Sequence, residues 1–259
     1  MIELIEAHSY LSTPADTQTL YDGWLIRLSA NSAKRANSVN FPEKSSPRLS
    51  VDAKIAHCER LYFDQSKPCI FRITPLAAPD WLQDYLIAKQ YVLMDPTDVL
   101  IRDLTSNPPR PPAPHITLTN QPAADQLNAL CRLTEKSDPK IAAFCESLDL
   151  IKIKTLYAFA YETGEIVSSG LATVDGNLMG LFEFATNAAH QRRGYAASIT
   201  NALLHAGAAA GAKTAYLQVV QDNAAGALFW QNQHFNEKRY EYRYLIKEPP
   251  HDYVSTGDI

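Results

Sequence analysis

The sequence predicts an α/β protein of two domains, the second of which contains a run of three antiparallel strands. Residues 154–162, 166–174 and 178–186 have the apolar patterns of strands, and only short glycine-containing turns separate them. An alanine-rich helical segment follows directly. Five prolines within residues 107–114 separate these elements from the first part of the chain, because proline removes backbone donors and favours extended geometry.

The second domain is predicted at residues 115–259. A short strand and two helices come first, at residues 115–118, 123–134 and 139–148. Both alternating sets of side chains in the strand at 154–162 are apolar, which indicates a strand buried on both faces. Asp175-Gly176-Asn177 is a strong hairpin signal between the next two strands.

The helix after the three strands is predicted at residues 194–210, where apolar side chains at spacings of four, three and four form one stripe. Gly211 ends it. A short buried strand follows at 216–220, and Asp222-Asn223 offers a cap for another short helix that runs through Gln233. The final element is a strand or hairpin at residues 237–247.

The first domain is predicted at residues 1–104 and the linker at residues 105–114. Its elements alternate between strands and helices, which we expect at residues 24–29, 51–63, 69–73, 81–88 and 99–104.

Composition limits the classes of function. The chain of 259 residues has a net charge of −4 and a sequence pI near 6.0, so it has no general attraction for nucleic acid or an anionic membrane. No apolar run approaches the roughly 20 residues that span a bilayer, and the acidic amino terminus is unlike a signal peptide, which predicts a cytoplasmic protein. The four cysteines lie singly and the seven histidines lack ligand spacing, which predicts free thiols and no metal.

The most informative segment is residues 185–197, where an apolar strand passes through a polar turn into a helix. The first N–H groups of a helix have no partner within it and lie at the positive end of its dipole. Gly194 and Ala196 are small enough for a ligand to approach the main chain, and Arg192 and Arg193 can add charge-assisted hydrogen bonds. This segment predicts a site for a diphosphate.

The order of elements, together with Gln191-x-x-Gly194-x-Ala196 at the exit of the third strand, resembles the GCN5-related N-acetyltransferase (GNAT) superfamily. Asn223, Phe229-Trp230 and Phe235 lie downstream at the distances expected for that superfamily. The resemblance covers about residues 115–247. It implies an α/β (α+β) fold with a mixed, mostly antiparallel GNAT sheet flanked by helices, and acetyl-CoA as the co-substrate, with its pyrophosphate on the amides of the turn.

The resemblance also implies the residues that hold acetyl-CoA. Main-chain groups of the third strand would face the pantetheine and the thioester carbonyl, the turn would hold the pyrophosphate, and the later helix would flank the pantetheine. The set is Phe184, Ala185, Thr186, Gln191, Arg192, Arg193, Gly194, Tyr195, Ala196, Ala197, Asn223, Phe229 and Trp230. Three alternatives stay open, namely that the glycine only relieves a tight turn, that one arginine lies on the surface, and that the two aromatic residues belong to the core.

Glu183 is the candidate general base, because it is the only carboxylate in the third strand and a carboxylate beside a ligand cleft can take a proton. The sequence does not decide whether it faces the cleft or the helices, although the cost of burying a charge favours the cleft. The tyrosine that serves as the acid in the superfamily is replaced here by Trp230, which has no useful acidic proton. Tyr195, Tyr240, Tyr242 or water are the alternatives.

The first domain echoes the second half of a GNAT domain and is interpreted as a degenerate tandem module. Residues 34–39, Lys-Arg-Ala-Asn-Ser-Val, stand where the glycine-containing turn would be. Arg35 is either functional or part of an ordinary solvated loop.

These observations predict an N-acetyltransferase that moves an acetyl group to a primary amine by direct attack in a ternary complex. A non-catalytic acyl-CoA-binding sensor or scaffold is the alternative, and a purely structural protein is a third reading. The acceptor is a small-molecule or peptide amine that the sequence does not specify, and a homodimer is left open.

Overall fold

The computed structural model describes residues 1–42, 48–106, 108–111, 113, 115–136, 138–253 and 255. Its internal contacts divide the chain into two compact units. The first unit comprises residues 1–98, 220–222 and 240–259, and the second comprises residues 99–219 and 223–239. The described residues from 240 onward thus group with the amino-terminal part. The domain boundaries expected at 104 and 115 stay a prediction.

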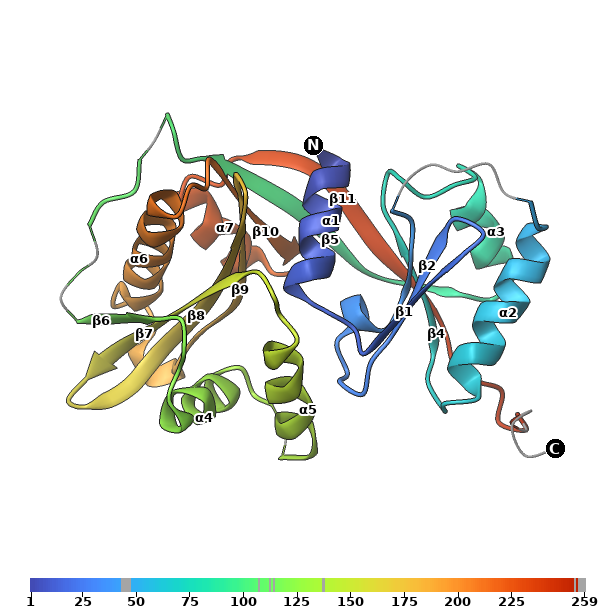
Figure 1. Cartoon of the computed structure of the whole chain (residues 1–259), viewed down its shortest axis with the longest axis horizontal. Coiled ribbons are helices and arrows are strands. Elements are labelled where there is room, and N and C mark those ends of the chain that lie inside the picture. Colours follow the sequence, from blue (N-terminus) through green and yellow to red (C-terminus); the bar gives the residue numbers. More distant parts are fainter. Residues whose placement is uncertain are drawn as a thin grey trace. The chain divides into compact units, whose positions relative to one another are not determined.

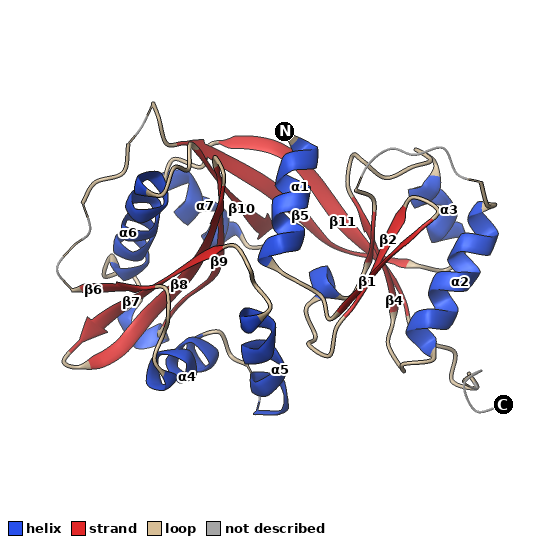
Figure 2. Cartoon of the chain, viewed as in Figure 1, coloured by secondary structure: helices blue, strands red, loops and turns tan. Residues whose placement is uncertain are grey.

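The first unit is a sheet with helices (Figures 1 and 2). Its strands follow the order β1-β2-β3-β4-β11, with β3 and β4 parallel and the other neighbours antiparallel. Buried aromatic rings fill its core, where Trp24 meets Phe41 and Phe71 edge to face. The elements are α1 (Ile2–Ser12), β1 (Thr17–Tyr21), β2 (Trp24–Leu28), a 3-10 turn (Lys34–Ala36), β3 (Val39–Asn40), α2 (Val51–Phe63), β4 (Cys69–Ile73), α3 (Leu82–Ala88), the start of β5 (Val92–Asp103) and most of β11 (Glu237–Lys247).

The second unit is built around antiparallel strands β6 to β9, with β10 parallel to β9. Helix α6 packs on β7 and β8, and α4 packs on β8 and β9, so that helices cover both faces of this sheet (Figure 1). The elements are β6 (Ile116–Thr119), α4 (Ala124–Leu133), α5 (Asp138–Asp149), β7 (Lys154–Glu162), β8 (Glu165–Asp175), β9 (Leu178–Thr186), a 3-10 turn (Ala188–His190), α6 (Tyr195–Ala209), β10 (Thr214–Val220) and α7 (Ala224–Asn232).

The predicted fold class is confirmed, and the elements of the second unit lie where the sequence pattern places them. The first unit differs from the prediction in two ways. Helix α1, the strands β1 and β3 and the 3-10 turn at Lys34–Ala36 are additional elements, and β5 begins at Val92, seven residues before the predicted start. Because proline interrupts a strand ladder, the sequence pattern indicates a strand that starts after Pro96. The observed strand instead continues through Pro96, and the preceding Asp95 lies in the left-handed region at φ 49°.

Two further predictions concern the cysteine thiols and the proline-rich linker. Cys58, Cys69 and Cys131 are buried free thiols, and Cys145 is a partly exposed free thiol. The predicted linker falls partly on residues 107, 112 and 114, which lie outside the described residues. None of the helices in the described ranges is both long and apolar enough to cross a bilayer.

Candidate functional site

The turn between β9 and α6 has one open side. Asn187 begins it by accepting a hydrogen bond from the amide of Ala189 at 3.0 Å. Arg192 then takes a φ of 64°, and Gly194, which caps α6, takes a φ of 86°. Residues with a side chain rarely adopt such a conformation, and a Cβ built on Gly194 would meet no atom within 4 Å. The positive φ therefore explains the glycine at this position, and the missing side chain leaves space in front of the turn.

The residues at the start of α6 line this open side. The amide of Ser198 donates to the carbonyl of Gly194 at 3.0 Å. The amides of Tyr195, Ala196 and Ala197 come before it and have no carbonyl one turn back in the helix. They lie at the positive end of the helix dipole, which is where an anion is bound most favourably.

Strands β9 and β10 separate next to this turn. They are paired only from Leu178 to Gly180 on β9, whereas β9 remains paired with β8 as far as Thr186. Glu183, with a φ of 53°, sits at an irregularity of the β8–β9 ladder. A Cβ on the facing Gly170 would lie 2.8 Å from Ile199 and 3.0 Å from the ring of Phe184, so glycine is needed for this close approach.

A groove of about 650 Å³ extends from the separated strands across the turn to α7. It contains twelve of the thirteen residues predicted to bind acetyl-CoA, which the tertiary structure therefore brings together. Among the described residues, its lining includes two basic side chains, His190 and Arg192, and no carboxylate. Six residues that the sequence did not assign to the site also line it, namely His190, Ala225, Gly226, Leu228, Asn232 and Gln233.

Arg193 is the predicted residue that does not line the groove. Its guanidinium lies 3.3 Å from the Glu162 carboxylate and is 54% exposed. Glu162 also accepts from His190 Nε2 at 2.8 Å, and its hydrogen bond with Tyr195 is the main cause that raises the pKa of that phenol. Consecutive side chains in a tight turn point in different directions, so one arginine faces the groove and the other faces this carboxylate.

The aromatic residues of α7 belong both to the core and to the groove. Trp230 is 9% exposed and packs edge to face against Phe184, Phe229 and Phe235, at centroid distances of 4.9, 4.7 and 5.6 Å. Asn223 caps the helix, because its Oδ1 accepts from the amide of Gly226 at 2.9 Å.

Glu183 forms an ion pair and is not among the described residues that line this groove. Its carboxylate accepts from Lys136 Nζ at 2.9 Å, and both side chains are partly exposed, at 22% and 25%. The sequence leaves the orientation of Glu183 toward the cleft undecided, and it stays a prediction; its positive φ lies at an irregularity of the β8–β9 ladder. Its role as a base stays a prediction. Among the alternative acids, Tyr195 lines the groove, whereas Tyr240 and Tyr242 belong to the first unit.

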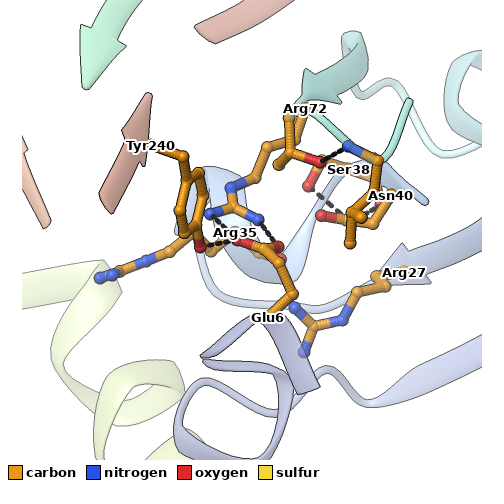
Figure 3. Close-up of polar contacts among 9 residues, drawn as sticks. Glu6, Arg27, Arg35, Ser38, Asn40, Arg72 and Tyr240 are labelled. Atoms are coloured by element: carbon orange, nitrogen blue, oxygen red, sulfur yellow. Dashed lines mark hydrogen bonds and ion pairs between the residues drawn. The ribbon is translucent and has the colours of Figure 1, made fainter. Parts of the chain in front are cut away.

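A buried polar cluster lies in the first unit (Figure 3). Arg72 of β4 donates to both carboxylate oxygens of Glu6 of α1, with Nη2 3.0 Å from Oε1. The Tyr240 hydroxyl donates to the same carboxylate, and Tyr242 stacks on the Arg72 guanidinium at 3.8 Å. Residues so distant in sequence share no motif, so only the tertiary structure reveals the cluster.

The stretch at residues 34–39 forms a packed corner beside this cluster. Arg27 is 1% exposed and donates to the carbonyl of Arg35 at 2.6 Å and to that of Tyr10 at 3.3 Å. The Asn37 side chain accepts from the amide of Ser29 at 2.9 Å. The corner is therefore held by hydrogen bonds to main-chain atoms, and the functional role considered for Arg35 stays untested.

The fold and the groove define a member of the GNAT superfamily, as the sequence resemblance implied. More specifically, the chain belongs to the family described as "Probable histone acetyltransferase Rv0428c C-terminal", whose model matches residues 1–245. Among curated proteins none matches the sequence.

Solved structures share this fold. A GCN5-related N-acetyltransferase from Kribbella flavida superposes with a TM-score of 0.71 at 13% identity, covering 96% of each chain. A conserved protein of unknown function from Staphylococcus epidermidis has a TM-score of 0.66 at 11% identity and covers 92% of this chain and 96% of its own. A tandem GNAT protein from the clavulanic acid biosynthesis pathway has a TM-score of 0.65 at 10% identity and covers 88% of this chain and 79% of its own. At these identities the likeness is one of fold.

Proposed function

We propose that this chain is an N-acetyltransferase that moves an acetyl group from acetyl-CoA to a primary amine of a small molecule or peptide. The observation that carries the proposal is the groove of the second unit, which is lined both by the first residues of α6 and by the part of β9 that is not paired with β10. We further propose that the first unit is a degenerate tandem module.

The residues of the groove fit acetyl-CoA. Its diphosphate needs amide donors and positive charge, which the start of α6 and Arg192 supply without any competing carboxylate among the described lining residues. Its pantetheine arm is an extended chain with amide groups, and the edge of β9 at residues 184–186 offers main-chain groups for it beside the rings of Phe229 and Trp230. When bound, acetyl-CoA supplies an activated acyl group and a thiolate leaving group.

The remaining chemistry falls to the chain's own residues. An amine attacks only when it is neutral, so a group of the chain or a water must accept its proton. Glu183 is our candidate, and Lys136 would position its carboxylate through their ion pair. Main-chain amides of β9 beside the groove would stabilise the developing oxyanion. Trp230 offers no acidic proton, so Tyr195, which lines the groove, or water would protonate the thiolate.

Binding of an acyl-CoA without turnover is the second candidate function. Two observations favour it, namely Trp230 at the position of the superfamily's tyrosine and the ion pair that occupies Glu183. A sensor or scaffold needs the groove in order to bind an acyl-CoA, but it needs neither a general acid nor a general base.

Purified protein, acetyl-CoA and a panel of amines separate the two functions. Thermal unfolding with increasing acetyl-CoA reports binding, and free thiol followed over time reports transfer. We expect a saturable rise in the unfolding temperature and thiol release that depends on one class of amine. A saturable rise without release with any amine would favour the sensor, and the absence of both would refute the proposed site.

A further inference from the structure

A second pocket of about 480 Å³ adjoins the groove in the second unit. The two share Ala197 of α6 and the pair Asn232 and Gln233 at the end of α7, so they lie side by side on these two helices. Asn201 lies four residues beyond Ala197, or about 6 Å along the helix. The second pocket therefore begins within one helical turn of the first residues of α6, which line the groove.

This pocket is basic. Arg102, Arg110 and His234 line it, and no carboxylate is found among its described lining residues. Arg102 is 8% exposed, and its Nη1 donates to the carbonyl of Gln233 at 3.0 Å, which fixes the guanidinium against the end of α7. Burial lowers the pKa of Arg102, because desolvation disfavours the charged form of the guanidinium. An anion in the pocket would stabilise that charged form.

Arg110 is anchored through its backbone. Asn201 of α6 accepts from the Arg110 amide at 2.9 Å and donates to its carbonyl at 2.8 Å and to that of Pro111 at 3.3 Å. The neighbouring prolines restrict the main chain further. The Arg110 side chain is exposed, and in the described part of the chain no carboxylate forms an ion pair with it. The positive charge is thus held beside α6 and is available to a ligand.

We propose that this pocket binds the 3′-phosphate on the ribose of coenzyme A, with Arg110 as the main contact and Asn201 as the residue that positions it. The inference rests on the proposed function, because it takes the diphosphate to lie on the first amides of α6. Only the ribose separates the diphosphate of coenzyme A from its 3′-phosphate, which suits a second basic pocket one helical turn away. The consequence is that the protein distinguishes coenzyme A from its 3′-dephospho form.

Isothermal titration of the full chain with coenzyme A and with 3′-dephospho-coenzyme A tests this inference. We expect the wild-type protein to bind coenzyme A at least tenfold more tightly. Arg110→Ala should weaken coenzyme A binding to the level of the dephospho form and leave binding of the dephospho form unchanged. Asn201→Ala should reduce the preference in the same direction, and Arg239→Ala, which removes an exposed arginine of the same unit outside the pocket, should preserve it.

The outcomes separate the inference from the proposed function. Equal affinity of the wild-type protein for the two nucleotides, or a preference that survives Arg110→Ala, would overturn the 3′-phosphate site while leaving the groove intact. Failure of the folded wild-type protein to bind either nucleotide would overturn the proposed function and this inference with it. Thermal unfolding of each variant checks that the fold is retained.

Discussion

Substitution of Gly194 separates the turn's role in folding from its role in binding. A Cβ at this position meets no atom within 4 Å, so an added side chain should project into the groove without a clash. The cost to folding is then the left-handed conformation at φ 86°, about 1 kcal/mol for any residue with a Cβ. For a chain of this size that lowers the unfolding temperature by roughly 2–4 °C. Gly194→Ala, Gly194→Gln and Gly194→Glu should therefore be destabilised alike.

Binding of acetyl-CoA should distinguish these variants. A carboxylate about 4 Å from a diphosphate costs at least about 1 kcal/mol for each phosphate charge, even at the dielectric constant of water. Gly194→Glu should consequently bind acetyl-CoA at least roughly 30-fold more weakly than the neutral Gly194→Gln, which has the same size. Isothermal titration at low and high salt measures the difference, which should shrink as salt screens the charges. Equal affinities of the two variants would refute the placement of the diphosphate at this turn.

Three further predictions test single features. Glu183→Gln should slow turnover by at least about tenfold while changing the dissociation constant of acetyl-CoA little, and equal turnover rates would exclude this carboxylate as the base. Glu6→Gln should lower the free energy of unfolding by about 3 kcal/mol or more, because it leaves the buried Arg72 guanidinium without its counter-charge, and denaturant unfolding against a Glu6→Leu/Arg72→Met control measures this. Hydrogen bonds from two backbone amides lower the pKa of Asp22 below 3.8, so its stabilising effect exists above that pH and is lost as the pH falls through the lower native value. Asp22→Asn should thus be less stable than the wild type at pH 7, with the two unfolding curves converging in acid.

The sequence alone was sufficient to predict the helices and strands of the second unit and most of the residues that line the groove. Strand alternation, hairpin turns and a helix stripe are local patterns, and each follows from the period of the backbone. The twelve groove residues were predicted for a related reason, since they belong to a strand, a turn and two helices whose order along the chain already implies the fold. Gly194 is the clearest example, because the turn needs a positive φ at this position and positive φ favours glycine, so one residue type in the sequence indicates the backbone conformation.

Only the tertiary structure decided where individual side chains point. Arg192 and Arg193 are identical in the sequence pattern, yet one faces the groove and the other faces Glu162, a residue of another strand. Glu183 takes a positive φ at an irregularity of the β8–β9 ladder, which no local signal predicts for a glutamate.

The largest gap between sequence and structure lies in contacts between distant segments. Glu6 and Arg72 are 66 residues apart, and Arg110 and Asn201 are 91 residues apart, so neither pair has a spacing that could be read as a motif. Local propensity and periodicity act over a few residues, whereas the pairing of buried charges and the anchoring of a proline-rich segment depend on which elements the completed fold brings together.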